Sequence, residues 1–197
     1  MGKSLEFLFD LMSPYSYLAA TQIPGLAQRT SASVTWVPVY LPGVMRATGN
    51  RGPTDVAPKA IYTFKDLNDW ARHYGLPQIV LPDEFPFQAA AGDRLVLAAA
   101  EAGKGPELAL ALYRKIWAER QNANDDATLR DAVTEVGLDP AVLMPRAQSD
   151  EVRARLKANT ERAVERGALG CPTFFVDGDQ MFVGNDRLMF VEKALKS

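Results

Sequence analysis

The chain opens with a short apolar and aromatic stretch, Leu5-Glu6-Phe7-Leu8-Phe9, which stops at Asp10 and predicts a buried strand. Ser13-Pro14 follows and favours a helix start, because serine caps free amides and proline is tolerated at the first helical position. We expect this helix to reach about Gln28. Residues 34–40 are rich in β-branched and aromatic side chains and predict a second strand. Together these elements predict a β-α-β unit with a parallel strand pair.

Between the second strand and about residue 167, the sequence changes to alanine- and leucine-rich stretches broken by proline and glycine. Helices are predicted over residues 59–74, 89–102, 107–120, 126–136 and 150–166. Two short apolar strands, 173–177 and 180–183, then flank a turn at Gly178-Asp179, and a last helix begins near Asp186.

The order of elements, β-α-β, then a helical block, then β-β-α, predicts an α/β protein with a thioredoxin-like topology. We expect residues 1–42 and 168–197 to form the thioredoxin-like domain. Residues 43–167 would then form a large, all-helical inserted domain.

Composition and charge are those of an ordinary globular protein: 47% of the 197 residues are hydrophobic and 23% are charged. The net charge of -2 offers no basic surface, so we expect neither a nucleic-acid nor a membrane partner. Glu6 and Asp10 interrupt the first apolar stretch too early for a secretory signal, which favours a cytoplasmic protein. One cysteine, Cys171, and one histidine, His73, leave no dithiol couple and too few ligands for a zinc site.

Chemistry is expected where the strands end, because ligands collect at the carboxyl ends of strands in open α/β sheets. Ser13 to Ser16 form the first candidate segment, since a helix N-terminus stabilises an anion such as a ligand thiolate. The alternative interpretation is that Ser13 only caps the helix.

Two further segments are candidates for the same site. In Gly170-Cys171-Pro172-Thr173, a cis proline would expose the backbone of Cys171 for pairing with a peptide ligand, whereas a trans proline would only open an edge strand. In Gly184-Asn185-Asp186, the carboxylate of Asp186 would suit a ligand's ammonium group or would simply cap the last helix.

Taken together, these segments resemble the 2-hydroxychromene-2-carboxylate isomerase family, with kappa-class glutathione transferases as near relatives. The resemblance rests on Phe9-Asp10 through Ala19, on Gly170 to Gly178, and on Gly184 to Leu188. It extends over the whole chain through Gly49-Asn50, Lys59, Asp66-Leu67, Trp70-Ala71 and Tyr74-Gly75-Leu76-Pro77. It implies glutathione as a cofactor, a small aromatic carboxylate as the substrate, and a homodimer.

The resemblance also implies roles for particular residues. Ser13 is the expected catalytic residue, with a hydroxyl that donates a hydrogen bond to the glutathione sulfur and favours its thiolate form. Cys171 and Pro172 would bind the cysteinyl part of glutathione through their backbone. Asn185 and Asp186 would hold the γ-glutamyl end, and Gly184 would let the backbone approach.

Three more residues are expected around the substrate. Asn50 and Lys59 match polar positions over the glutathione and substrate pocket, although Lys59 could be only a solvated helix charge. Phe85 would line an aromatic-substrate pocket, or be plain core.

The implied reaction is addition of the glutathione thiolate to an unsaturated substrate, rotation about the bond made single, and elimination that regenerates glutathione. The alternatives are a kappa-like transferase that consumes glutathione by conjugation, and a non-catalytic thioredoxin-like binding module. The family usually has an aliphatic residue before the cis proline, where this chain has Cys171. That thiol either forms a mixed disulfide with glutathione under oxidising conditions or is a small buried hydrophobe.

Overall fold

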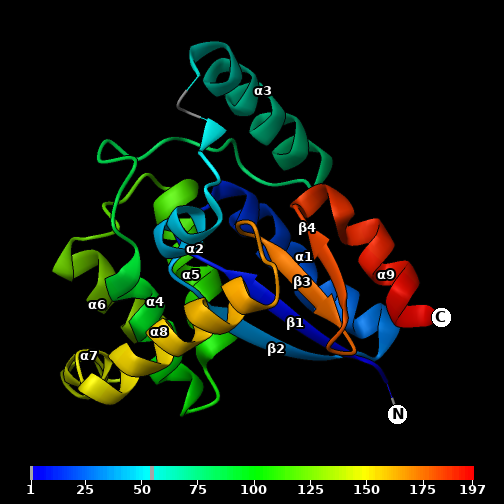
Figure 1. Cartoon of the computed structure of the whole chain (residues 1–197). Helices are drawn as coiled ribbons and strands as arrows, with labels where there is room; N and C mark the ends of the chain where they lie inside the picture. The colour runs from blue at the N-terminus through cyan, green and yellow to red at the C-terminus, as the bar shows by residue number, and fades with distance from the viewer. Residues whose placement is uncertain (1, 54–55) are drawn as a thin grey trace.

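The computed structural model describes residues 2–53 and 56–197 of the chain. The fold is built around a four-stranded mixed sheet (Figure 1). Its strands lie in the order β2-β1-β3-β4. They span Ser4–Phe9 for β1, Ser33–Pro38 for β2, Thr173–Val176 for β3 and Gln180–Val183 for β4. β2 runs parallel to β1, whereas β3 pairs antiparallel with both β1 and β4. The predicted α/β thioredoxin-like topology is therefore confirmed.

Alternation along β1 decides which layer each side chain joins, because successive side chains in a strand point to opposite faces. Phe7 and Phe9 belong to the larger core cluster, where Phe7 stacks on Phe174 with 5.4 Å between the ring centroids. Leu8 points to the other face and packs in a second cluster with Val37 and Phe175. The sheet is therefore buried on both faces.

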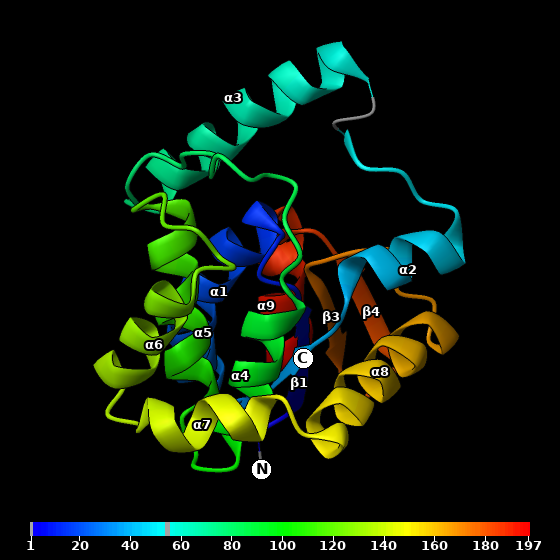
Figure 2. The same ribbon diagram turned by 90° about the vertical axis from the view of Figure 1, so that its left-hand side faces the viewer.

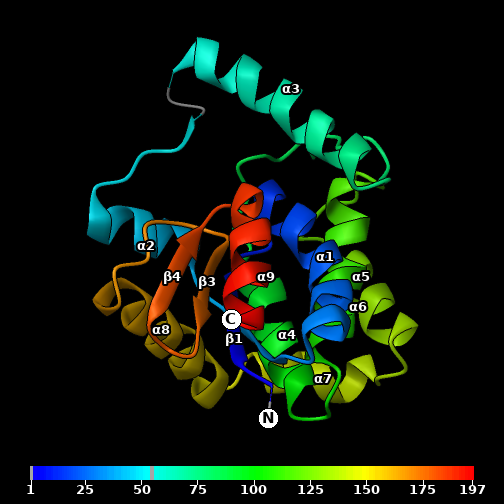
Figure 3. The same ribbon diagram turned by 90° about the vertical axis from the view of Figure 1, so that its right-hand side faces the viewer.

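The helices divide between these two faces. Helices α1 (Pro14–Thr30) and α9 (Leu188–Lys196) cover one face, and α8 (Asp150–Glu165) crosses the other, as Figure 3 shows from the side of α9. The remaining helices are α2 (Leu41–Thr48), α3 (Ala57–His73), α4 (Ala90–Ala100), α5 (Gly105–Trp117), α6 (Asp126–Glu135) and α7 (Pro140–Ala147). Within the described ranges, none of these helices has the length and apolarity needed to cross a membrane.

Helices α2 to α8 all lie between β2 and β3 in the sequence, as expected for a helical insertion. The insertion packs tightly on the sheet: Trp117 of α5 and Leu95 of α4 share the larger core cluster with Phe7 and Phe9. Helix α3 is the exception, because it stands away from the sheet at the top of the molecule (Figures 1 and 2). Its Ile61 and Tyr62 side chains are largely exposed.

Two helices were not predicted. Both α2 and α7 have eight residues, and both carry proline in the first turn, with Pro145 also inside α7. Both segments are short and contain proline, although proline fits the first turn of a helix, where its missing N–H costs nothing. The other predicted elements agree with the structure to within a few residues at their ends.

Candidate active site

Ser13 occupies the end of the turn between β1 and α1 and is almost completely buried. It caps α1, since its Oγ accepts a hydrogen bond from the Ser16 amide at 3.1 Å. The same hydroxyl donates to the carbonyl oxygen of Cys171 at 3.0 Å. The capping interpretation is thus correct. In addition, the Ser13 hydroxyl links the start of α1 to the segment that precedes β3 through a hydrogen bond.

The peptide bond between Cys171 and Pro172 is cis, as the glutathione-binding interpretation of this segment expected. Within the described chain, the backbone amide of Cys171 makes no hydrogen bond. Its side chain packs against the smaller core cluster. Burial, with added repulsion from Asp10 and Asp93, raises the pKa of the Cys171 thiol well above its usual value. The thiol is half-buried, and its raised pKa makes it a weak nucleophile near neutral pH.

The third segment is held against the second. The Gly184 amide donates to the carbonyl oxygen of Pro172 at 2.9 Å. Gly184 has a φ of 103°, and a Cβ at this position would lie 2.5 Å from Oδ1 of Asp186, so only glycine fits without strain. The structure thereby brings Ser13, Cys171, Pro172, Gly184 and Asp186 into one continuous cluster.

Asp186 and its neighbour Asn185 form a short helical turn, Asn185–Arg187, before α9. The alternative role for Asp186 is wrong: α9 begins after Arg187 and has no side-chain cap. Asp186 is instead partly exposed and pairs with Arg187 at 3.2 Å. Asn185 is buried, and its Nδ2 finds no partner among the described residues. Both line a small pocket of about 200 Å³ between α1, α3 and α9.

Asn50 reaches the same region from the loop after α2. Its Nδ2 donates to the carbonyl oxygen of Leu169 at 2.8 Å, just before the cis proline. Lys59 is exposed in the first turns of α3, and in the described part of the chain no ion pair joins it to the other candidates. The geometry therefore places Asn50, but not Lys59, against the cluster.

Phe85 lies one layer behind the turn that carries Ser13. Its ring packs edge to face on Trp117, with 5.8 Å between the centroids. The indole Nε1 of Trp117 donates to the carbonyl oxygen of Leu11 at 2.9 Å. Phe85 is partly buried, so its ring combines a core contact with a partly open face.

The sequence analysis missed a polar link between the site and α3. The Tyr15 hydroxyl donates to Oδ2 of Asp66 at 2.8 Å. Burial and the nearby carboxylates of Asp66 and Asp186 raise the pKa of Tyr15 well above its ordinary value. Asp66 is part of a motif that carried the family resemblance, but only the three-dimensional contact shows that it faces the first turn of α1.

Comparison with known proteins shows which family the chain belongs to. The family model of the DSBA-like thioredoxin domain matches residues 4–196. A 2-hydroxychromene-2-carboxylate isomerase from Sphingobium xenophagum is 36% identical over 99% of this chain and 99% of its own length. The chain belongs to the 2-hydroxychromene-2-carboxylate isomerase family. This membership covers the thioredoxin-like core and the helical insertion together.

Solved structures and more distant relatives extend the family. The structure of a 2-hydroxychromene-2-carboxylate isomerase superimposes with a TM-score of 0.89 and 27% sequence identity, over 98% of this chain and 94% of the other. Glutathione S-transferase kappa 1 of Caenorhabditis elegans is 25% identical over 98% of this chain and 90% of its own length. The isomerase family is therefore related to transferases whose name includes glutathione.

Proposed function

We propose that this protein is a glutathione-dependent isomerase that acts on 2-hydroxychromene-2-carboxylate or a similar intermediate of aromatic degradation. The observation that carries the proposal is the Ser13 hydroxyl beside the cis Cys171-Pro172 bond, at the N-terminus of α1. Family membership supports the reaction class, and the kappa relatives support glutathione as the cofactor.

The residues around Ser13 fit glutathione. In the described chain, the backbone amides of Tyr15 and Cys171 make no hydrogen bonds, so two donors near Ser13 are available to a ligand. The Cys171 backbone would pair with the cysteinyl part of the tripeptide. The Asp186 carboxylate would pair with the γ-glutamyl ammonium group, and the unpartnered Nδ2 of Asn185 would donate to its carboxylate.

Glutathione, when bound, would supply a thiolate for reversible addition to the conjugated double bond of the substrate. The chain's own residues would make that thiolate available. Ser13 would donate a hydrogen bond to sulfur once its hydroxyl released the Cys171 carbonyl, and the free Tyr15 amide and the dipole of α1 would also favour a negative charge there. Ser13 is a hydrogen-bond donor, not a nucleophile, because no histidine or other base contacts its hydroxyl among the described residues.

Substrate recognition is assigned to residues over this cluster. The Asn50 amide, already bound to the carbonyl of Leu169, and the ammonium group of Lys59 would receive the substrate carboxylate. For Lys59 this requires that α3 approach the body of the protein. The open face of the Phe85 ring would contact the aromatic part of the substrate.

A kappa-like transferase is the second candidate, favoured by the 25% identity to glutathione S-transferase kappa 1 over nearly the whole chain. Both enzymes need an activated thiolate, and they differ in whether glutathione is returned. A non-catalytic binding module would bind glutathione without any turnover.

The first experiment is absorbance-monitored turnover of 2-hydroxychromene-2-carboxylate with and without glutathione, together with titration of free thiol. Glutathione-dependent isomerisation at constant thiol concentration supports the isomerase. Loss of one thiol per turnover indicates the transferase, and binding without reaction towards a panel of electrophiles indicates the module.

The family resemblance also supports a homodimer in the cytoplasm. Light scattering coupled to size-exclusion chromatography tests the dimer, and fractionation of the source cells tests the location.

A further inference from the structure

Two completely buried carboxyl groups, Asp10 and Asp93, lie beneath the turn that carries Ser13. Both oxygens of Asp10 accept backbone hydrogen bonds, from Met12 and from Leu41, each at 2.7 Å. Asp93 of α4 accepts a hydrogen bond from the Leu11 amide at 3.2 Å through Oδ1. The other oxygen of Asp93 is buried and has no partner among the described residues.

The same turn is fixed by groups from α5. The Tyr113 hydroxyl donates to the carbonyl oxygen of Asp10 at 3.0 Å, and the Trp117 indole donates to that of Leu11. The Ser13 amide donates to the Asp10 carbonyl at 3.0 Å. Three side chains of α4 and α5 therefore form hydrogen bonds with the backbone of Asp10 or Leu11, which lie within three residues of Ser13. They are Asp93, Tyr113 and Trp117.

The close approach of α4 to this turn is built into its sequence. A Cβ on Gly92 would lie 2.6 Å from Cδ1 of Leu11, nearer than side chains tolerate. Glycine at this position lets the helix come close enough for the next residue, Asp93, to reach the Leu11 amide.

We propose that Asp93 is a positioning residue, whose carboxyl group holds the Leu11 amide and so fixes the turn that presents the Ser13 hydroxyl. The proposal rests on the function proposed above. Asp93 acts through the backbone and does not touch the substrate or the cofactor.

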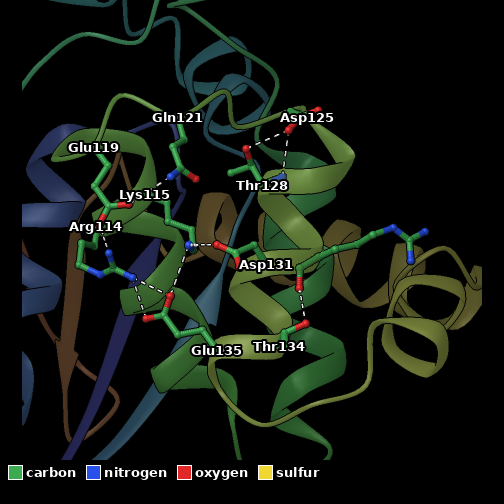
Figure 4. Close-up of polar contacts among 10 residues, drawn as sticks. Arg114, Lys115, Glu119, Gln121, Asp125, Thr128, Asp131, Thr134 and Glu135 are labelled. Atoms are coloured by element: carbon green, nitrogen blue, oxygen red, sulfur yellow. Dashed lines mark hydrogen bonds and ion pairs between the residues drawn. The ribbon is translucent and has the colours of Figure 1, made fainter.

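The charges around Asp93 indicate that it performs this role as a neutral acid. Burial, reinforced by the nearby Asp10, raises the pKa of Asp93 well above its usual value. The nearest cation on its own helix, Arg94, is turned towards the carbonyl oxygen of Ala147 at 3.1 Å. The buried ammonium group of Lys115 on α5 is engaged by Asp131 and Glu135 of α6 (Figure 4).

Asp10, which accepts two amide hydrogen bonds, is the better site for the negative charge, so the proton of the pair belongs on Asp93. Tyr113 and Cys171 are the other titratable groups that face the pair, and the pKa of each is raised, so both are neutral at neutral pH. Loss of the Asp93 proton at alkaline pH would place a second buried negative charge under Ser13. That charge would oppose the thiolate, and activity would fall.

The test compares Asp93→Ala and Asp93→Asn, with Leu97→Ala as the control. Asn keeps an oxygen for the Leu11 amide but has no proton to lose, whereas Ala removes the acceptor. Leu97 lies on the same helix, but its side chain packs in a separate cluster with Val152 and Leu156. Leu97→Ala therefore reports the effect of lower stability alone.

Hydrogen exchange of the peptide that contains residues 10–13 gives a readout that does not depend on activity. We expect Asp93→Ala to lose about tenfold or more of the protection in this turn, and Asp93→Asn and Leu97→Ala to retain it. In turnover assays, Asp93→Ala should lower kcat by about 10- to 100-fold with a smaller change in KM. Asp93→Asn should keep kcat near neutral pH and lose the alkaline decline.

The proposal is overturned if Asp93→Ala keeps both protection and kcat, if Asp93→Asn is as impaired as Asp93→Ala, or if Asp93→Asn keeps the wild-type alkaline decline. Should Asp93→Ala fail to fold, the pH profile of Asp93→Asn still decides. If the wild-type protein does not isomerise the substrate, the proposed function fails, while hydrogen exchange still tests the positioning role separately.

Discussion

The Ser13 hydroxyl lies 3.0 Å from the carbonyl oxygen of Cys171, and a carbonyl can only accept, so the hydroxyl proton of Ser13 points at Cys171. The lone pair of the same hydroxyl accepts the Ser16 amide. Ser13 therefore has its donor committed within the protein. To donate to a ligand sulfur, it must release the Cys171 carbonyl, which is easiest if a ligand N–H takes its place.

This exchange predicts that the cysteinyl N–H of glutathione is needed to activate its own thiol. Glutathione methylated at the cysteinyl nitrogen should bind without the fall in thiol pKa that we expect for bound glutathione, because Ser13 stays on Cys171. The thiolate absorbance of the bound ligand as a function of pH measures this. Glutathione methylated at the glycyl nitrogen is the matched control, and equal thiol pKa values for the two analogues would contradict the exchange.

Removal of the Ser13 hydroxyl should impair catalysis, and it should also lower stability by about 1 kcal/mol because α1 loses its cap. A hydrogen bond to a charged group contributes about 1.5–3 kcal/mol, so Ser13→Ala should lower kcat/KM by roughly 10- to 150-fold. Ser16→Ala is the control, because Ser16 Oγ is buried nearby and has no hydrogen-bond partner among the described residues. Steady-state kinetics of both variants test the prediction, which fails if the two lose activity equally.

Gly184→Ala should weaken glutathione binding, because the new Cβ would collide with Asp186 and the residue would have to keep a positive φ. Gly178→Ala provides a matched control. Gly178 lies in the hairpin turn and also has a positive φ, of 83°. A Cβ at this position would contact no atom of the described residues within 4 Å. Both variants should lose about 1 kcal/mol of stability, whereas only Gly184→Ala should raise the Kd for glutathione in calorimetric titration. Equal Kd values for both variants would refute the assigned role of Gly184.

Cys171 should react slowly in the native protein. Its thiol pKa is raised by burial and by the neighbouring carboxyl groups, so little thiolate exists near neutral pH. We expect no mass increase after exposure of the native protein to oxidised glutathione or iodoacetamide, and complete alkylation in urea. A glutathione adduct on the native protein would instead support the mixed-disulfide hypothesis.

The buried carboxyl pair predicts how stability depends on pH. Burial raises the pKa of Asp10 from 3.8 to about 6 and raises the pKa of Asp93 well above its usual value, so the folded state binds more protons than the unfolded state. Their contribution is therefore fully present below the unfolded pKa and is lost as the pH rises through about 6 and beyond. For Asp10 alone, a shift of about two units corresponds to about 3 kcal/mol.

Asp93→Asn should thus gain stability relative to wild type as the pH is raised from about 5 to 8, by about 1–3 kcal/mol. Urea unfolding of both proteins at the two pH values measures the difference, and groups common to both cancel. Asp69→Asn is a control that should show no change with pH, because Lys65 holds the pKa of the exposed Asp69 below its usual value and its carboxylate stays ionised in both states over this range. A gain that does not grow with pH would mean that Asp93 is not a buried titrating group.

The strands and the terminal hairpin could be predicted from sequence because their signals are local. Leu5 to Phe9 alternate between two buried faces. The hairpin turn, predicted at Gly178-Asp179, lies one residue earlier, because Asp177 and Gly178 take the positive φ values that a tight turn needs. The cluster of Ser13, Cys171 and Gly184 followed from the topology and the family resemblance, and the structure bonds Ser13 to Cys171 and Gly184 to the adjacent Pro172.

The contacts that remained unpredicted join residues far apart in the chain. Asp93 lies 82 positions from Leu11, and Asp66 lies 51 from Tyr15. An aspartate inside a helical pattern looks like a surface charge, and only the close approach of α4 at Gly92 shows that Asp93 is buried. The short helices α2 and α7 were missed because their eight residues are fewer than the stretch over which helical periodicity can be recognised.

The turn before α1 also limits how this protein can be re-engineered. Its backbone is held by Asp93, Tyr113 and Trp117, all contributed by the helical insertion. If a relative's insertion replaces the insertion of this protein, the chimera must therefore keep Asp93, Tyr113 and Trp117 at the matching positions. Without them, Ser13 would still be in the sequence but the backbone that positions its hydroxyl would not be fixed. The insertion and the thioredoxin-like core therefore have to be exchanged together, not separately.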